Sequence, residues 1–591
     1  MGRLLLFLFL FWNFSAWGQL PRIAFLSDIH FQDLYGRFSD HDFKGIENPG
    51  TGRPVILRTM AAQLHSTRIF NENYFAFLAA LDDAAARGIR LIALPGDFSD
   101  DGQAYNLRGL RKILDEYRLK YGIRFFITTG NHDPVGPFRQ EGGKRDFLGA
   151  DGGPLGIYSL ESLARGQGSI ITKDIAMSGY LEILEELGAF GLQPSPDDLY
   201  WGTPFRFTGP EEYRFAAAEK YGDYRYRMYE VSPGFSVPDL SYVVEPVDGL
   251  WILAIDGNTY IPKNTDGDPA DAGNYNSSSV GYSHVMTHKT HLISWVKKIT
   301  DEARKRNKTV VAFTHYPMIE YNEGASEEIG QLLGKTKWQL HRAPGEEVAR
   351  TFADAGLQIH FGGHMHINDT GVRRYEDGKM LVNIQVPSLA AYIPAYKILT
   401  VKPGNLFEIE TVILDKVDRF DELFPLYEKE HEALREAGGP RIWNKDILST
   451  RSYREFTLFH LQELLRLRMI PSDWPKDFME KAGPLTGEDL LRLARHKPNL
   501  KNRRYRQWGF DELLLDLYKF QSADELARRD IPKQRLKQYA VLCREFEQLE
   551  TGDAFALQLK GLFRILSKIS DGDPSDHFEV DLQKGEVRKL K

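Results

Sequence analysis

The 591-residue chain contains a single cysteine, Cys543. One thiol cannot form an intramolecular disulfide, and it cannot supply the several thiolates of a structural zinc site or an iron–sulfur cluster. Any metal bound by this chain must therefore be held by oxygen and imidazole ligands.

Basic residues are outnumbered, because 82 Asp and Glu side chains face 75 Lys and Arg and give a formal net charge of -7. A general nucleic-acid binder usually presents a basic face to the phosphate backbone, so we do not expect nucleic acid as a partner. The 42% of hydrophobic residues can build sizeable cores, which excludes a wholly disordered chain. At about 150 residues per domain, the length predicts roughly two to four domains.

Long hydrophobic runs are absent except at the N-terminus. Residues 4–14 are nearly all Leu and Phe, follow the basic Arg3 and precede Ala16-Trp17-Gly18. This layout is typical of a signal peptide and predicts cleavage after Gly18. A membrane anchor is the alternative reading, but an anchor needs about 20 apolar residues. We therefore expect residues 1–18 to be removed and the mature chain to be exported without a transmembrane span.

From Arg22 onward, short apolar runs alternate with helical patterns, which predicts parallel strands and a layered α/β domain over residues 19–414. Helices are expected at 73–87, 103–121 and 288–306. Strands are expected at 23–26, 91–94, 125–128, 224–229, 242–245, 250–255, 310–313, 357–361, 381–385 and 396–401.

Two regions depart from this rhythm. Residues 134–222 are rich in Gly-containing loops and are interpreted as an insertion that covers the active site and selects the substrate. Residues 415–591 are rich in Leu, Arg, Lys and Glu, and they predict a separate, mainly helical C-terminal domain of unknown partner.

Polar motifs follow five of the predicted strands at the points where those strands end. Open α/β sheets bind ligands at such strand ends, and glycine there permits close backbone approach. The motifs are Asp28-Ile-His30, Gly96-Asp97, Gly130-Asn131-His132-Asp133, Thr314-His315 and Gly363-His364-Met-His366. Each alone could be a turn or a buried polar residue, but five in order within one domain are poorly explained by coincidence.

This series resembles the calcineurin-like metallophosphoesterase superfamily, over about residues 22–401. The resemblance implies an α/β (α+β) fold, a four-layer αββα sandwich of two mixed sheets, with a dinuclear metal site. By position, Asp28, His30 and His366 would bind one divalent metal ion, Asn131, His315 and His364 would bind the other, and Asp97 would bridge the two. These ligands suit manganese, zinc or iron.

The same resemblance implies that His132 is the general acid that protonates the leaving alkoxide, with Asp133 as its orienting group. Purple acid phosphatases, a branch of the superfamily, carry a tyrosine ligand three residues after the bridging aspartate. That position is Asp100 here, which argues against a tyrosinate-bound iron.

The sequence thus predicts an exported hydrolase of phosphomonoesters or phosphodiesters, acting on a small molecule or a lipid headgroup. Two metals can acidify a shared water and clamp the attacking and leaving oxygens of an in-line displacement. A cyclic-nucleotide or sphingomyelinase-like lipid phosphodiesterase is an alternative reading. A binding protein that kept the fold and lost catalysis is a second, disfavoured by the intact ligand set.

Two further patterns are weaker. Gly330 to Thr336 resembles a phosphate-binding loop but is one spacer residue short. Lys501, Arg503, Arg504 and Arg506, interleaved with Tyr505 and Trp508, could grip an anionic partner, although a solvated helix end explains them better.

Overall fold

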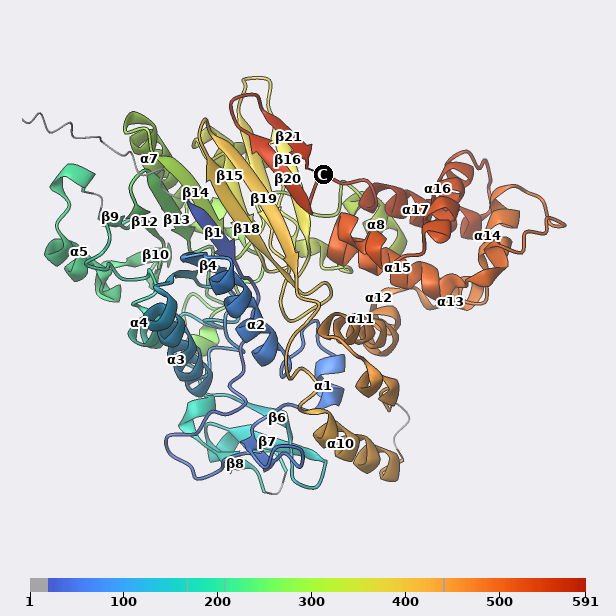
Figure 1. Ribbon diagram of the computed structural model, residues 1–591, viewed down its shortest axis with the longest axis horizontal. Coiled ribbons are helices and arrows are strands. Elements are labelled where there is room, and N and C mark those ends of the chain that lie inside the picture. The colour runs from blue at the N-terminus through green and yellow to red at the C-terminus, as the bar shows by residue number, and fades with distance from the viewer. Residues whose placement is uncertain (1–19, 167, 207, 439–441, 591) are drawn as a thin grey trace, which may run out of the picture.

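Residues 20–590, apart from 167, 207 and 439–441, are described by a computed structural model (Figure 1). The predicted signal peptide, residues 1–18, lies outside the described residues. Within the described part of the chain, no helix combines the length and apolar character needed to cross a membrane.

Two mixed seven-stranded sheets form the sandwich that the sequence predicts. The first has the order β21-β20-β19-β18-β1-β4-β5 and the second the order β16-β17-β15-β14-β13-β12-β9. The first contains β1 (Arg22–Phe25), β4 (Leu91–Pro95), β5 (Arg124–Thr128), β18 (Ala395–Lys402), β19 (Leu406–Ile413), β20 (His577–Asp581) and β21 (Glu586–Lys589). The second contains β9 (Tyr200–Gly202), β12 (Tyr242–Val247), β13 (Leu250–Ile255), β14 (Thr309–Thr314), β15 (Ile359–Gly362), β16 (Asp369–Arg374) and β17 (Met380–Gln385).

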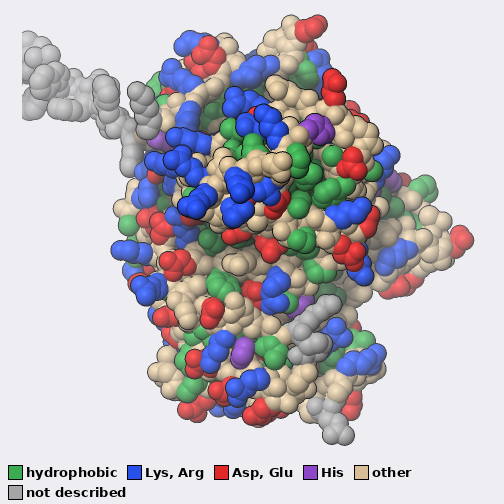
Figure 2. Space-filling model, turned by 90° about the vertical axis from the view of Figure 1, so that its right-hand side faces the viewer, with side chains coloured by type: hydrophobic (Ala, Val, Ile, Leu, Met, Phe, Trp, Pro, Cys, Tyr) green, Lys and Arg blue, Asp and Glu red, His purple; other side chains and the backbone are tan. Residues whose placement is uncertain are grey.

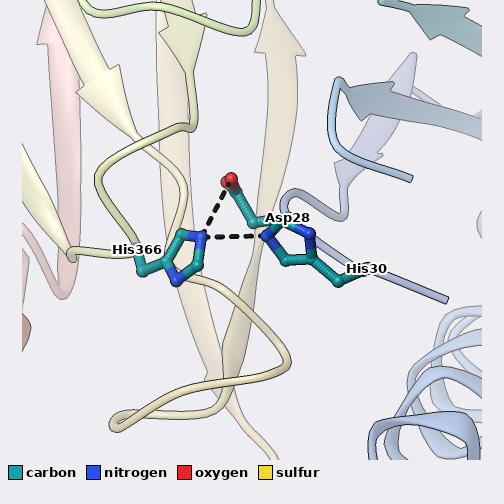
Figure 3. A group of neighbouring side chains, drawn as sticks. All are labelled: Asp28, His30 and His366. Carbon is teal, nitrogen blue, oxygen red and sulfur yellow. Dashed lines mark hydrogen bonds and ion pairs between the residues drawn. The ribbon is translucent and has the colours of Figure 1, made fainter. Parts of the chain in front are cut away.

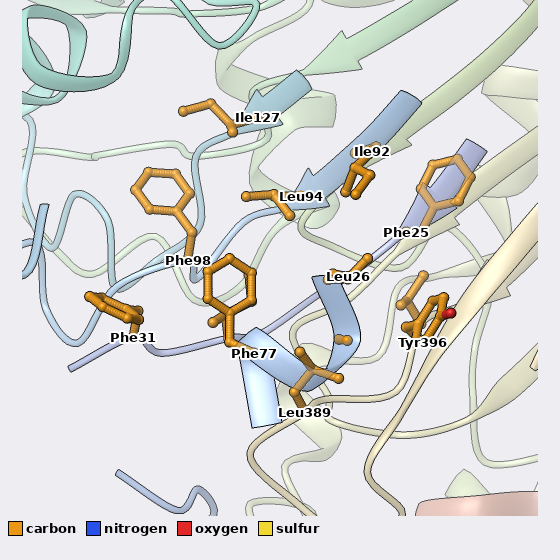
Figure 4. Packing of buried hydrophobic residues seen from close by; sticks show 14 of the residues in the cluster. Phe25, Leu26, Phe31, Phe77, Ile92, Leu94, Phe98, Ile127, Leu389 and Tyr396 are labelled. Carbon is orange, nitrogen blue, oxygen red and sulfur yellow. The ribbon is translucent and has the colours of Figure 1, made fainter. Parts of the chain in front are cut away.

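The two sheets face each other through apolar side chains. Phe25 of β1 stacks on Phe361 of β15 with ring centroids 3.8 Å apart, and both are fully buried. On the outer face of the first sheet, Phe77 of α2 (Asn73–Ala86) lies among side chains such as Ile92 and Leu94 (Figure 4). Each fully buried Phe or Leu contributes roughly 1.5–3 kcal/mol of transfer free energy, so these contacts hold the layers together.

Helices cover the outer faces, and short strand pairs fill the connections. The helices before residue 415 are α1 (Met60–Leu64), α2, α3 (Ala104–Tyr121), α4 (Tyr180–Leu187), α5 (Phe215–Gly222), α6 (Tyr282–His288), α7 (His291–Lys305), α8 (Ser326–Leu333) and α9 (Glu346–Asp354). The short strands are β2 (Ile46–Glu47), β3 (Pro54–Val55), β6 (Gly143–Leu148), β7 (Pro154–Tyr158), β8 (Ile170–Ile171), β10 (Met228–Ser232) and β11 (Phe235–Pro238).

The C-terminal helices lie beside the sheets (Figure 1); the first of them packs on the core of the sandwich, and most of the others pack with α8 around a second core. They are α10 (Phe424–Glu436), α11 (Tyr453–Leu464), α12 (Ile470–Asp473), α13 (Lys476–Ala482), α14 (Gly487–Ala494), α15 (Phe510–Ala523), α16 (Lys533–Glu547) and α17 (Ala554–Ile569). A π-helical turn over Leu465–Met469 joins α11 to α12. We call residues 415–576 the helical region.

Two sequence predictions are corrected by these elements, and a third is refined. Tyr224–Tyr226 form a 3-10 turn, and the neighbouring strand begins only at Met228. The proposed insertion is interrupted, because Tyr200–Gly202 is strand β9 at the edge of the second sheet. The C-terminal region is mainly helical, as predicted, but β20 near its end pairs with β19 and returns the chain to the first sheet.

The outer face of the helical region carries many Lys and Arg side chains, which gather in the upper part of Figure 2. Within the basic stretch that the sequence singles out, Lys501, Arg503 and Arg504 are exposed, whereas Tyr505 and Trp508 are buried. The stretch therefore offers no exposed aromatic ring on which a nucleobase could stack.

Candidate metal centre and its cavity

The sheet topology brings the five predicted motifs to one edge of the sandwich. Strands β1, β4 and β5 are parallel neighbours, as are β13, β14 and β15 in the other sheet. Parallel strands end at a common edge, so the loops that follow them meet there. The side chains assembled at this edge are Asp28, His30, Asp97, Asn131, His315, His364 and His366.

One group of ligands consists of Asp28, His30 and His366 (Figure 3). The Nε2 atoms of His30 and His366 are 3.0 Å apart, and His366 Nε2 is 3.4 Å from Asp28 Oδ1. Asp28 and His30 follow a strand of the first sheet and His366 follows a strand of the second, so this group of ligands connects the two sheets.

The second group consists of Asp97, His315 and His364, with Asn131 beside it. His315 Nε2 lies 3.0 Å from His364 Nδ1, 3.1 Å from Asn131 Oδ1 and 3.2 Å from Asp97 Oδ2. The same Asp97 oxygen is 3.8 Å from Nε2 of His30 in the first group. Asp97 thus stands between the two groups, in the place of a bridging carboxylate.

Backbone carbonyls fix the tautomers of three of these imidazoles. A carbonyl only accepts, so His315 Nδ1 donates to Pro95 O (3.0 Å), His364 Nε2 to Ser279 O (3.0 Å) and His366 Nδ1 to Thr67 O (3.2 Å). The other nitrogen of each ring then carries a lone pair, and that nitrogen is the one that faces the neighbouring ligands. Outer hydrogen bonds of this kind orient metal-binding histidines in general.

The donor set fits a pair of divalent metal ions. The lone pairs on His315 Nε2 and His364 Nδ1, which face each other at 3.0 Å, would repel, and a cation between them removes that repulsion. Burial lowers the pKa of both His30 and His364 well below the ordinary value, so these imidazoles are neutral and able to bind metal. Zinc, manganese or iron would accept such imidazole and carboxylate ligands.

The backbone around the ligands is strained. Five of the seven ligand residues have φ between 45° and 73°, a region that non-glycine residues rarely occupy, namely Asp28, His30, Asp97, His364 and His366. Glycines permit the accompanying close approaches, since a Cβ on Gly130 would lie 2.2 Å from Asp97 Oδ1 and one on Gly363 would lie 2.4 Å from Asp28 Oδ2. Strain of this kind clusters at functional sites.

His132 lies at the rim of the metal centre with its side chain partly exposed. Its backbone N–H donates to Asp97 Oδ1 (2.8 Å), and its ring is 5.2 Å from that of His30. Its Nδ1 pairs with Asp101 Oδ1, while Arg68 Nη1 donates to its Nε2 (3.2 Å). The ring is therefore held between an acid and a base.

The prediction that Asp133 orients His132 is wrong. Asp133 is fully buried and accepts a hydrogen bond from the backbone N–H of Phe98 (3.1 Å), and Asp101 takes the orienting place. Sequence reasoning missed Asp101, although it is an acidic residue in the loop that carries the ligand Asp97. Its neighbour Asp100 pairs with Arg58 Nη1 (3.0 Å) and Arg68 Nη2 (3.1 Å) and does not reach the metal centre.

The metal centre opens into a cavity of about 440 Å³. Asp97, Asn131, His132, His364 and His366 form its floor. The walls come from residues 66–68, 336–342, 468–473 and 521–522, the last two of which belong to the helical region. No residue of 134–222 lines the cavity, although Lys144 of this segment pairs with Asp101 beside His132.

A sandwich of two mixed sheets that presents this ligand set at its strand ends defines a metal-dependent hydrolase of phosphoesters. Residues 21–203 match the family described as Calcineurin-like phosphoesterase, which supports the metallophosphoesterase superfamily. The matched range includes the first three motifs, up to Asp133, and stops before the histidines contributed by β14 and β15.

Two solved structures are among those that the chain matches at low identity. A dimetal phosphatase from Danio rerio is 8% identical, with a TM-score of 0.32 over 66% of this chain and 96% of its own. GAP50, described as the anchor in the inner membrane complex of Plasmodium, is 12% identical, with a TM-score of 0.25 over 67% of this chain and 84% of its own. A search among curated proteins returned no significant match.

Proposed function

We propose that the protein hydrolyses a small, water-soluble phosphoester at the two-metal centre. The convergence of seven ligand residues from both sheets at the floor of one cavity carries this proposal. When bound, two divalent ions supply an activated water and stabilise the charge of the reacting phosphoryl group.

The chain's own groups complete the reaction. His132, held by Asp101, is placed to give a proton to the leaving oxygen, and the Asp101 carboxylate stabilises the imidazolium before that transfer. Arg68, which contacts Nε2 of His132, is placed to bind a phosphoryl oxygen and to release that nitrogen for proton transfer.

The cavity walls favour an anionic, soluble substrate. Arg68, Lys337, Arg342 and Arg468 line the cavity, whereas Asp97 and Asp473 are the acids lining it. Arg342 has no ion-pair partner among the described residues, and its buried Nε has no hydrogen-bond partner. Its guanidinium stays charged at neutral pH and is free to bind an anionic group of the substrate.

This lining disfavours both a lipid phosphodiesterase and a cyclic-nucleotide phosphodiesterase. A lipid substrate calls for an apolar rim, and stacking of a nucleobase calls for a free aromatic ring. Trp338, the aromatic residue that lines the cavity, is 6% exposed and already packs on Tyr518 at a centroid distance of 4.5 Å.

A substrate panel tests the proposal. Purified protein reconstituted with manganese or zinc should hydrolyse soluble phosphomonoesters or small phosphodiesters with higher kcat/KM than cyclic nucleotides or phospholipid vesicles. Arg342→Gln should raise KM about 10-fold or more, as loss of a charge-assisted hydrogen bond implies. A preference for vesicles, or an unchanged KM in this variant, would reject the proposed substrate class.

Export of the enzyme belongs to the same proposal. Its support is the leader-like composition of residues 1–18. N-terminal sequencing of the protein recovered outside the cytoplasm should begin at Gln19, and recovery of Met1 on cytoplasmic protein would contradict export.

A further inference from the structure

A second group of acidic side chains lies where the helical region meets the sandwich. We call Glu323, Asp369, Asp524 and Asp573 the junction cluster. Glu323 lies between β14 and α8, and Asp369 is the first residue of β16. Asp524 follows α15, and Asp573 lies between α17 and β20.

These four carboxylates are close together although they come from separate segments. Burial and then the nearby charges of Glu323 and Asp524 raise the pKa of Asp369, so these carboxyl groups are neighbours. A Cβ on Gly572, next to Asp573, would lie 2.7 Å from Glu323 Oε1 and 3.3 Å from Asp524 Oδ1. The chain thus gathers acidic oxygens around one point of the junction.

Two of the carboxylate oxygens are buried without a partner. Asp369 is 4% exposed and Asp524 is 6% exposed, and the Oδ2 atom of each has no hydrogen-bond donor. Burial raises the pKa of Asp369 well above its ordinary value and that of Asp524 to about 7. An unpaired buried carboxylate is costly, so such a cluster needs either protons or a cation.

The nearby basic side chains offset this charge only in part, because the Lys397 ammonium interacts with Asp369 and Asp524 but is a single cation beside four carboxylates. Lys397 is fully buried, and its three N–H groups are directed at Asn368 Oδ1 (2.6 Å), Thr411 Oγ1 (2.8 Å) and Ser575 O (2.5 Å). Arg373 forms a two-point ion pair with Glu346. Within the described residues, no member of the junction cluster has an ion-pair partner.

We propose that the junction cluster binds one calcium ion. All available ligands are oxygens, and calcium accepts six to eight carboxylate, carbonyl and water oxygens in irregular arrangements. Among described residues, only the two groups of the metal centre bring three ligand atoms within 4.8 Å of one another. The junction carboxylates must therefore move toward one another to bind the ion, and calcium accepts ligands in flexible arrangements.

The position of the cluster gives the ion a role in shaping the catalytic cavity. Asn368 follows the metal ligand His366 by two residues, and its backbone N–H and Nδ2 donate to Ser522 O (2.9 Å) and Ala523 O (3.3 Å). Ser522 also lines the cavity. A calcium ion between Asp369 and Asp524 would fasten this wall to the loop that carries His366.

The test is calcium binding to the full-length protein that holds manganese or zinc at its metal centre. Equilibrium dialysis with radioactive calcium should show about one bound ion per chain, and millimolar calcium should raise the thermal unfolding midpoint by a few degrees. The double variant Asp369→Asn/Asp524→Asn should lose both effects, whereas Asp571→Asn, an exposed neighbour outside the cluster, should keep them.

The double variant also separates a bound ion from shared protons. If the cluster holds only protons, the substitutions relieve carboxylate repulsion, and the wild-type midpoint does not respond to calcium. Absence of stoichiometric calcium binding to the wild type, or equal binding to the double variant, would overturn the proposal. If the double variant does not fold, the single variant Asp524→Asn in the dialysis experiment gives the same decision.

Discussion

The metal centre and the junction cluster are two polar sites built in different ways within one molecule. Each ligand of the metal centre follows a strand directly, and imidazoles supply four of its seven side chains. The junction cluster consists of carboxylates alone and is assembled from segments on both sides of the boundary between sandwich and helical region. The first site is set by the sheets, and the second exists only when the two parts are joined.

This difference predicts different metal chemistry. Imidazole nitrogens suit zinc, manganese or iron, whereas an oxygen-only site suits calcium. It also predicts different consequences of occupancy: ions at the metal centre are needed for hydrolysis, and an ion at the junction is needed for the stable union of the two parts.

Selective chelators should separate the two sites most clearly. A nitrogen-donor chelator such as phenanthroline should abolish measurable hydrolysis, because it removes borderline metals held by imidazole. A calcium-selective chelator should leave hydrolysis largely intact and lower the unfolding midpoint. Activity and unfolding midpoint should be measured side by side. If both chelators changed both quantities equally, the two sites would not differ in metal and role.

The variant His132→Asn should lose roughly 10²–10⁴-fold in kcat, the usual contribution of a general acid. Metal content by elemental analysis should stay near two ions per chain, because the His132 side chain is not among the ligands. The effect should be smaller for substrates with a good leaving group. A uniform loss across leaving groups would assign His132 another role.

The variant Asp101→Asn should lose roughly 10–100-fold in kcat, as observed for residues that orient a functional histidine. Its distinguishing readout is the pH–rate profile, since the imidazolium of His132 loses the carboxylate that stabilises it. The profile of this variant should differ from that of the wild type. Asp42→Asn, at an exposed position, is the matched control and should leave the profile unchanged.

A single buried carboxylate between the sandwich and the helical region should show the smallest of these effects. Glu430 of α10 accepts the backbone N–H groups of Met60 (2.7 Å) and Ala61 (2.9 Å) at the start of α1. Burial raises its pKa from 4.5 to about 7. This group needs a proton rather than a cation.

The raised pKa of Glu430 makes stability depend on pH. The folded state holds the proton more tightly, so the stabilisation is complete below about pH 4.5 and is lost as pH rises through about 7. The loss amounts to about 3 kcal/mol at most for such a shift. Urea unfolding at pH 5 and pH 8 should show a smaller pH dependence for Glu430→Gln than for the wild type, and equal dependence would contradict the assignment.

The sandwich could be predicted from the sequence because its strands are continuous apolar runs between helical patterns. The sequence predicts both ends of the strand Leu250–Ile255, which is buried along its whole length. The seven ligand residues could be proposed because each motif is local to a strand end. His132 was proposed for the same reason.

The remaining features depend on contacts between distant segments. The pairing of His132 with Asp101, the position of Arg342 in the cavity wall and the junction cluster arise only when loops far apart in the chain meet. Strand β20 alternates apolar and polar residues, with Phe578 and Val580 buried, and this pattern is typical of a strand. It was missed because the long preceding segment has a helical pattern.

The last hairpin has a consequence for how the molecule is made. Strand β20 pairs with β19, and residues 415–576 stand between them in the chain. During synthesis the ribosome must deliver the entire helical region before the first sheet can gain its outer strands. Contacts that close so long a loop slow folding and leave a strand edge open in the meantime. The exposed edge of β19 in the nascent chain is thus the place where a chaperone would be most needed.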